Sequence, residues 1–518
     1  MPDRVLKPDV TMASVLSVLG QLPLLESVGE SNVASTLYDT LDWRLYRSGL
    51  ILREDQTNGS REVTVLDRHS SDALAGTRVG EVPRFASDLP AGRLRDRLAK
   101  HTKIRAVCPM AEVRSHVHRF KAVDMNDKTV AYVHVESTEV PTDSGVRRLG
   151  WRIRVEPLRG YDREADRLVH RLEESFGTTA TSDDLATRAL QVTHPDAGRV
   201  HPVSGTLLAP DTAAAEAFTE VLTQLLEAVV WNEKGVRSDI DTESLHDFRV
   251  AIRRTRSVLA AAKDVLAPEP LAMLRPEFRW LAQQTSDLRD LDVYLLGFEE
   301  LRSELPPPAD VGILPLRGFL RSARDDAFAQ LVAVLDQGRY RSLVNRYRYF
   351  LSHARSTVGQ PQASQPILAV ASERIWASYR SLLRHGRLVD DDAPIEALHD
   401  LRKRAKKLRY LIDAFRALFP DDEIAELIAA LKQLQDNLGE LQDCEVQTAR
   451  LEGFAELMTT GSRTSPATLS AMEVLIGHIR RREAGARAEF AEHFARFDRP
   501  RNRKRYRGLF RANLAGAE

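Results

Sequence analysis

The sequence predicts a multidomain protein in which an N-terminal α+β domain built on antiparallel strands is followed by an all-α region. Up to about residue 195, short segments alternate apolar with polar residues and are separated by Gly, Pro and Asp, the pattern of half-buried strands. Beyond residue 212, apolar residues recur every three to four positions, which is typical of amphipathic helices. One segment of this second part occurs twice, which indicates a duplicated helical unit.

The strand pattern is clearest at residues 61–66, 129–136 and 151–156. In the last of these, one face would carry Trp151, Ile153 and Val155, and the other Arg152, Arg154 and Glu156. This is the pattern expected for the wall of a barrel with one charged surface.

The helical pattern and the helix breakers predict eight helices and a set of boundaries. The helices are expected near residues 212–233, 245–266, 271–304, 314–356 (broken at Gly338), 366–386, 395–419, 422–454 and 467–496. The predicted domains are a barrel over 1–195, a linker over 196–211 and a helical region over 212–498, with repeat halves at about 212–358 and 365–498. A basic run over 499–518 is expected to lie in solvent as a C-terminal tail.

The repeated segment is strongly basic. Residues 245–256 read Leu-His-Asp-Phe-Arg-Val-Ala-Ile-Arg-Arg-Thr-Arg, and residues 398–409 read Leu-His-Asp-Leu-Arg-Lys-Arg-Ala-Lys-Lys-Leu-Arg, at an offset of 153. On a helix these side chains form one broad stripe in each copy. The first stripe contains His246, Arg249, Arg253, Arg254 and Arg256, and the second contains His399, Arg402, Lys403, Lys406, Lys407 and Arg409.

Cations stacked in this way repel one another, and an anion is the simplest compensation. A solvated face would explain a single basic helix, but it requires no particular register, so the recurrence favours a binding face. Arg suits phosphate because its planar fork donates two parallel hydrogen bonds, and Lys adds a flexible point charge. A polyanion would also raise the pKa of a neighbouring His. We therefore predict that the two stripes bind phosphate.

Each repeated His is followed 44 residues later by an Asp, at Asp290 and Asp443. The Leu-His-x-x-Arg helix, followed by Leu-Arg-Asp-Leu-Asp at 288–292 and Leu-Gly-Glu-Leu-Gln-Asp at 438–443, resembles the CHAD domain, the conserved histidine α-helical domain. The resemblance covers about residues 212–498. It implies two pseudo-symmetric four-helix bundles around a basic channel that binds inorganic polyphosphate.

Asp290, Asp292 and Asp443 are candidates for metal ligands or for residues that orient the basic stripes. We interpret them as orienting residues, because an acid near a buried helix is more often a cap or a partner of Arg. No metal ligand is predicted, although polyphosphate brings its own counterions.

Residues 37–53, Leu-Tyr-Asp-Thr-Leu-Asp-Trp-Arg-Leu-Tyr-Arg-Ser-Gly-Leu-Ile-Leu-Arg, resemble the CYTH family. The resemblance implies an antiparallel eight-stranded tunnel that hydrolyses or cyclises triphosphates with Mg²⁺ or Mn²⁺. Catalytic members open with Glu-x-Glu-x-Lys, whereas this chain reads Arg-Val-Leu-Lys-Pro-Asp-Val over 4–10. Because divalent metals need several oxygen ligands, we expect no catalytic residues and no required cofactor. Mg²⁺ or Mn²⁺ would matter only if the barrel were active. Arg53, Arg114 and Arg119 are candidates for holding phosphate in the tunnel.

Composition restricts the partners and the location. With 74 basic and 74 acidic residues, the formal net charge is zero, so nothing global marks a nucleic-acid or membrane binder. The two cysteines, Cys108 and Cys444, suit a reducing cytoplasm, and no run of 18 apolar residues occurs. We expect a cytoplasmic protein. The CHAD resemblance implies association with polyphosphate granules and with proteins of polyphosphate metabolism.

The predicted function is the binding of inorganic polyphosphate between the two basic helices. The enzyme alternative is a metal-dependent triphosphatase or polyphosphatase in the N-terminal barrel. A nucleic-acid binder is the third reading, and it is disfavoured because Phe248 and Tyr410 are the sole aromatic residues within the stripes.

Overall fold

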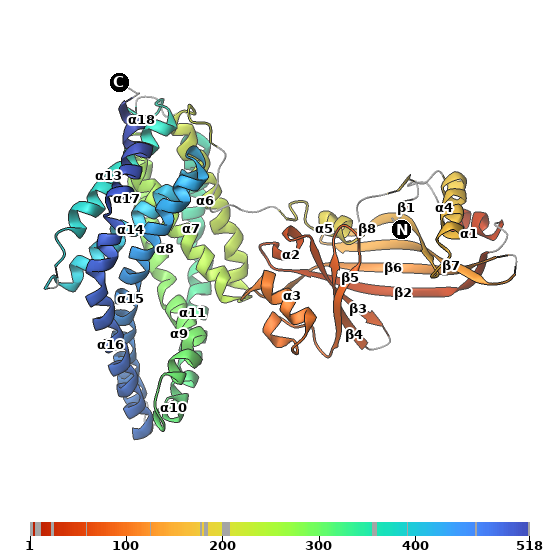
Figure 1. Ribbon diagram of the computed structural model, residues 1–518, viewed down its shortest axis with the longest axis horizontal. Coiled ribbons are helices and arrows are strands. Elements are labelled where there is room, and N and C mark those ends of the chain that lie inside the picture. Colours follow the sequence, from red (N-terminus) through yellow and green to blue (C-terminus); the bar gives the residue numbers. More distant parts are fainter. Residues whose placement is uncertain are drawn as a thin grey trace. The chain divides into compact units, whose positions relative to one another are not determined.

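The computed structural model describes residues 4–5, 12–21, 25–57, 60–124, 126–176, 179–180, 185–198, 208–354, 360–390, 392–460 and 464–515. The chain divides into two compact units, Met1–Val200 and His201–Glu518. This division falls within the predicted linker over 196–211, of which residues 199–207 lie outside the described ones. Strands dominate the first unit and helices the second (Figure 1).

The first unit is built on an antiparallel sheet whose described strands follow the order β5-β4-β3-β2-β6-β7-β8-β1-β9. They are β1 (Arg4–Val5), β2 (Leu25–Asp39), β3 (Leu50–Thr57), β4 (Ser60–Asp67), β5 (Ala73–Val79), β6 (Cys108–Val123), β7 (Thr129–Thr142), β8 (Gly145–Pro157) and β9 (Thr179–Ala180). Among the described residues, β5 and β9 form the two edges of the sheet. The sheet fits the predicted tunnel-like barrel. Beyond β1, the predicted departure at residues 4–10 lies outside the described residues.

The two faces of this sheet differ in polarity, as the alternation in the sequence predicts. One face packs against the helices of the unit: Val133, Ile153 and Val155 share a core with α1 (Met12–Gln21) and α4 (Asp162–Phe176). Farther along the same face, β3 and β4 pack against α3 (Arg93–Thr102). The opposite face carries the charged members of β8. The remaining elements are α2 (Arg44–Arg47), η1 (Ala86–Asp88) and α5 (Leu185–Thr193).

The second unit is helical. Its described helices are α6 (Ala214–Arg237), α7 (Thr242–Ala261), α8 (Pro268–Gln284), α9 (Ser286–Ser303), α10 (Ala309–Gly312), α11 (Leu314–Asp336), α12 (Gly338–His353), α13 (Ile367–Gly386), α14 (Ile395–Ala414), η3 (Arg416–Leu418), α15 (Asp421–Thr460), α16 (Pro466–Phe497), α17 (Pro500–Tyr506), η4 (Arg507–Arg511) and α18 (Ala512–Ala515). None of the helices in the described ranges combines the length and the apolar composition that a membrane crossing requires.

The duplication fixes where the helices begin. Adding the sequence offset of 153 to the first residues of α6, α7 and α8 gives the first residues of α13, α14 and α15. The copies also meet at equivalent residues, because Ala213 and Pro366 form an antiparallel bridge and differ by the same offset. Around this bridge, Ile367 N donates to Thr212 O and Ala214 N donates to Gln365 O, both at 2.8 Å. The two halves are therefore related by a pseudo-two-fold axis.

Both halves contribute to each hydrophobic core. The larger core joins α6, α7, α8 and α12 to α13, α14, the first part of α15 and the last part of α16. The smaller core packs Leu291 and Phe298 of α9 against Cys444 and Phe454 of α15, together with α11 and α16. The bundles therefore mix the predicted halves 212–358 and 365–498. The last residues of the first half, 355–358, lie outside the described ones.

The basic C-terminal run is helical and anchored, which differs from the expected solvated tail. Tyr506 of α17 is fully buried and stacks on Tyr379 of α13, with ring centroids 3.7 Å apart. Phe510 is also fully buried. The charge pattern concealed this arrangement, because the few aromatic residues within the run supply the apolar surface that docks it. Residues 516–518 lie outside the described ones.

Replacing the buried ring, Tyr506→Ala, should lower the free energy of unfolding of the helical unit by about 3 to 5 kcal/mol, because it removes a fully packed aromatic side chain. Urea unfolding followed by circular dichroism measures the change. Tyr349→Ala is the matched control, since Tyr349 is 69% exposed. Equal effects of the two substitutions would show that α17 does not stabilise the core.

Candidate anion-binding site

Helices α7 and α14 lie side by side (Figure 1). Each of the two helices buries one apolar stripe. The buried members are Leu245, Phe248 and Ile252 on α7 and their equivalents Leu398, Leu401 and Ala405 on α14. Helix α7 begins at Thr242 because the Asp241 carboxylate accepts a hydrogen bond from Ser244 N at 2.7 Å. The basic residues lie between the apolar positions, so most of them emerge at the edge of the stripe and are half-buried.

Four cations from the two helices converge, and we call Arg249, Arg253, Arg402 and Lys406 the cation cluster. Burial is the largest cause that lowers the pKa of Lys406 to about 8, and the charges of Arg402, Arg253 and Arg249 also lower it. Burial, and then the charge of Arg253, lowers the pKa of Arg249 to about 10. Arg253 Nε donates to the Tyr410 hydroxyl at 3.1 Å, which links α7 to α14. Like charges are thus held together where water screens them poorly.

Arg249 is oriented by uncharged oxygens where α8 gives way to α9. One of its terminal nitrogens donates to Thr285 Oγ1 at 2.6 Å, and to Ser286 Oγ and the Ala282 carbonyl at 3.3 Å each. These oxygens are available because the helix breaks at Thr285. They fix the guanidinium without cancelling its charge.

Arg402 is oriented differently, by a carboxylate. It donates to Asp443 Oδ1 at 3.0 Å. Burial raises the pKa of Asp443, while the charges of Arg402 and Lys406 oppose the rise. The equivalent Asp290 accepts a hydrogen bond from Arg450 at 3.2 Å, and Arg249 is one of the charges that lower its pKa against the rise caused by burial. Asp443 therefore contacts the cluster directly, whereas Asp290 bonds to Arg450 and influences Arg249 through its charge alone.

Asp292, the third acid predicted to orient the stripes, has another role. It is almost fully buried and accepts from Arg324 Nε of α11 at 3.0 Å, while Arg324 also donates to Asp239. Asp292 therefore joins α9 to α11 and to the turn after α6.

The remaining arginines of the two stripes fall into two groups. Arg254 and Arg409 approach the same carboxylate, that of Asp413, at 3.3 and 3.7 Å. Their charges are therefore partly neutralised. Arg256 extends the cluster toward α8: burial lowers its pKa, followed by the charges of Arg279 and Arg253.

The two exposed lysines have other neighbours. Lys403 Nζ lies 3.0 Å from Asp400 Oδ1. Partial desolvation of the Lys407 side chain, and then the charges of Arg404, Arg374 and Arg275, lower its pKa. The structure thus leaves both side chains on the outer parts of α14.

The two repeated histidines occupy equivalent positions at the start of the stripes. His399 Nε2 lies against the carboxylate of Glu445 of α15. His246 is half-buried on α7.

Sequence reasoning missed the basic residues that neighbouring helices add. Arg279 of α8 lies beside Arg256, and Arg289 of α9 donates to the Thr242 carbonyl at 3.1 Å. A signal for the first was present, since Arg275 and Arg279 are one helical turn apart. Which face of α8 would meet α7 was not visible in the sequence.

Three comparisons relate the chain to known proteins. Residues 220–452 match the family model of the CHAD domain. Over 289 residues the chain is 28% identical to two proteins of Mycobacterium tuberculosis, uncharacterized protein MT2285 of strain CDC 1551 / Oshkosh and uncharacterized protein Rv2226 of strain ATCC 25618 / H37Rv. Each match covers 55% of this chain and 53% of the relative, so the chain spans about half the length of these relatives.

Among solved structures, the chain is similar to the CHAD domain from the plant Ricinus communis, with a TM-score of 0.48 and 23% identity, covering 57% of this chain and 95% of that one. It is also similar to PptA from Streptomyces chartreusis, with a TM-score of 0.41 and 18% identity, covering 55% of this chain and 99% of that one. From the family match and the duplicated basic helices, we conclude that residues 220–452 of this chain form a CHAD domain.

Proposed function

We propose that the helical unit binds inorganic polyphosphate along the face shared by α7 and α14. The convergence of Arg249, Arg253, Arg402 and Lys406 carries this proposal. The lowered pKa values of Lys406 and Arg249 mean that the positive charges are held there against repulsion and desolvation. An anion lying against the four groups would relieve both costs.

A chain of phosphates fits this arrangement better than a single phosphate. Arg256 and Arg279 continue the row of positive charge beyond the cluster, so each added phosphate meets a further cation and releases counterions. Nε of Arg249 and Nε of Arg402 are buried without a hydrogen-bond partner among the described atoms. Such donors are uncommon in folded proteins, and a small rearrangement on binding would let them reach phosphate oxygens.

The other predicted residues would take supporting roles in this proposal. Arg254 and Arg409, which approach Asp413, would shape the face between the helices. His246, His399, Lys403 and Lys407 would meet the outer parts of a long chain. Binding would require no metal cofactor. Association with polyphosphate granules and with proteins of polyphosphate metabolism would follow from the same affinity.

Alanine in place of Arg249 or of Arg402 should weaken the affinity for long polyphosphate about ten- to a hundredfold, because each change removes charge-assisted hydrogen bonds. Titration with chains of graded length at two salt concentrations measures the effect. Arg480→Ala is the matched control, since Arg480 is exposed and ion-paired with Glu452 in the same unit.

Wild-type affinity should rise with chain length and fall steeply with salt. Single-stranded RNA at equal phosphate concentration should compete poorly, because the described site offers little base stacking. Unchanged affinity in both cluster variants would refute the site, and RNA that competes equally would point to a nucleic-acid function.

The affinity should also depend on pH through Lys406. A bound polyanion favours the protonated amine, so affinity is constant below the free-state pKa of about 8 and falls as the pH rises above it. The loss of this one proton accounts for up to about a tenfold lower affinity for polyphosphate at pH 9 than at pH 7. Lys406→Arg keeps its charge over this range and should flatten the profile. An equally steep profile in this variant would mean that another group titrates.

One observation favours a second anion site, in the N-terminal unit. On the polar face of the sheet, burial lowers the pKa of His134, and the charges of Arg154 and Arg119 lower it further. Cross-strand pairing puts both arginines on this face, as it does Arg53, whereas Arg114 points to the other face. Arg53 is bound to Asp55 at 2.8 Å.

We expect this face to hold anions without cleaving them. Full-length protein with triphosphate or polyphosphate and Mg²⁺ or Mn²⁺ should release no phosphate above background, because two-metal phosphoryl chemistry requires clustered carboxylates. In the described residues, the one group of three close metal donors lies on the opposite face. Metal-dependent release that Arg154→Ala abolishes would establish the triphosphatase alternative.

A further inference from the structure

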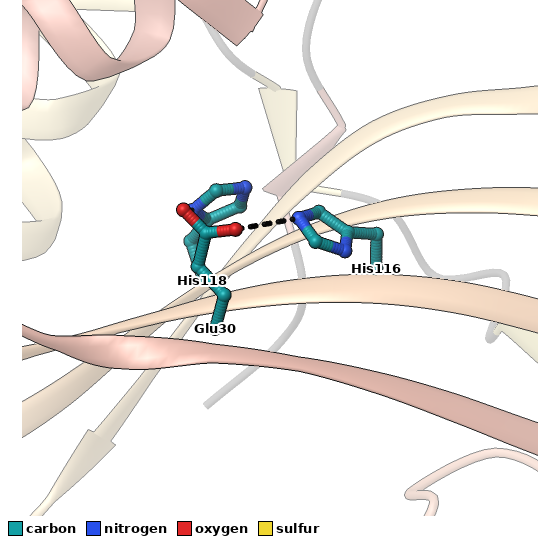
Figure 2. A group of neighbouring side chains, drawn as sticks. All are labelled: Glu30, His116 and His118. Carbon is teal, nitrogen blue, oxygen red and sulfur yellow. Dashed lines mark ion pairs between the residues drawn. The ribbon is translucent and has the colours of Figure 1, made fainter.

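Glu30 of β2 and His116 and His118 of β6 gather on the helix-covered face of the N-terminal sheet. Glu30 pairs directly with His118 across the strands, and Asn32 with His116. His116 Nε2 lies 3.2 Å from Glu30 Oε2, and His118 Nδ1 lies 3.1 Å from Glu30 Oε1. Figure 2 shows both imidazole rings beside the carboxylate.

The spacing of these atoms suits a single metal ion. One donor atom from each residue lies within 4.8 Å of the other two. Ligand atoms at about 2.0–2.1 Å from a tetrahedral zinc ion are themselves about 3.3–3.4 Å apart. Each imidazole nitrogen lies at close to that separation, 3.2 and 3.1 Å, from one of the two oxygens of Glu30.

The backbone holds the three side chains in place. A β-bulge interrupts the pairing of β2 with β6 between Ser27 and Gly29, immediately before Glu30. Gly29 has φ +143°, a conformation that residues with side chains rarely adopt. Bulges of this kind redirect the following side chain. His118 is 9% exposed at its side chain, whereas His116 and Glu30 are 40% and 57% exposed, so the cluster is anchored on one side and open on the other.

Asn32 sets the tautomer of His116. Its Oδ1 lies 2.7 Å from His116 Nδ1. Because a carboxamide oxygen only accepts, Nδ1 carries the proton and the lone pair remains on Nε2, which faces Glu30. Metal-binding histidines are commonly oriented by such a partner on the other ring nitrogen.

The alternative is that Glu30 accepts hydrogen bonds from two imidazoles without a metal. The ring centroids of His116 and His118 are 4.5 Å apart. In the absence of a metal, His116, whose Nδ1 proton points to Asn32, would need a second proton on Nε2 to donate to Glu30. A divalent ion allows both rings to remain neutral and keeps the carboxylate ionised, so it accounts for the convergence of all three donors.

We propose that Glu30, His116 and His118 bind a divalent transition-metal ion of the zinc class. Two imidazoles and one carboxylate favour Zn²⁺ over Mg²⁺ and Ca²⁺, which prefer all-oxygen sites. Three protein ligands leave one position open to solvent or to an oxyanion. His116 and Asn32 also line a surface hollow with Arg114, so the His116 side of the cluster borders an open surface. This site is independent of the cation cluster.

Zinc titrated into chelator-treated, full-length protein should bind at this site, as calorimetry measures, and excess Mg²⁺ should not displace it. Glu30→Gln and His116→Ala should each abolish this binding event. Asn32→Ala should weaken it about ten- to a hundredfold. His170→Ala is the matched control, because His170 lies near Glu174 as an exposed pair with two donors and should not affect the event.

Cobalt substitution gives a second readout, since four-coordinate Co²⁺ absorbs strongly in the visible range and the band should disappear in His116→Ala. His118→Ala tests the buried ligand, with circular dichroism to verify that the sheet is folded. Absence of zinc binding by the wild-type chain, or binding that persists in both Glu30→Gln and His116→Ala, would overturn the proposal.

Discussion

The burial of like charges between α7 and α14 is the constraint on which the helical unit depends. The apolar stripes of the two helices must pack into the larger core, and the cations at their edges are carried with them out of bulk water. Taking cations out of water is costly unless acceptors surround them. The surrounding helices supply those acceptors: the break between α8 and α9, Asp443 on α15 and Asp413 at the end of α14.

The sequence was sufficient to predict much of the helical unit, because duplication places the same pattern in two contexts. The offset of 153 correctly predicts that equivalent helices begin at equivalent residues. The same offset relates Arg249 to Arg402 and Arg253 to Lys406, the four cations that converge. It did not reveal that Asp413 would be shared by Arg254 and Arg409, or that Lys403 would pair with Asp400. The contact of Arg254 with Asp413 depends on how α7 packs against α14, which periodicity within one helix does not encode. The Arg409–Asp413 and Lys403–Asp400 pairs lie within α14 at i,i+4 and i,i+3 spacing, so the sequence alone could have indicated them.

In the N-terminal unit, the sequence predicted the buried face of a strand but not the group of metal-binding side chains. Alternation of apolar and polar residues predicted which face of β8 enters the core, because side-chain direction in a strand follows from position alone. No metal site was predicted. Glu30 and His116 are far apart in sequence, and their meeting depends on the register of β2 against β6 and on the bulge before Glu30. A His-x-His pair on one strand was the available signal, but it does not identify the third ligand.

The two copies have diverged around the same cation. Thr285 and Ser286, which hold Arg249, correspond to Leu438 and Gly439 in the second copy, where α15 continues without a break. The second copy therefore lacks the hydroxyls, and Arg402 relies on Asp443.

A hydroxyl orients a guanidinium without reducing its charge, whereas a carboxylate does both. Arg249 is held by hydroxyls with the charge of Asp290 nearby, whereas Arg402 bonds directly to Asp443, so the two sides of the cluster are not chemically equivalent. A polyphosphate chain bound across both helices would meet two unequal ends, so the pseudo-two-fold symmetry of the fold would not make its two directions equivalent.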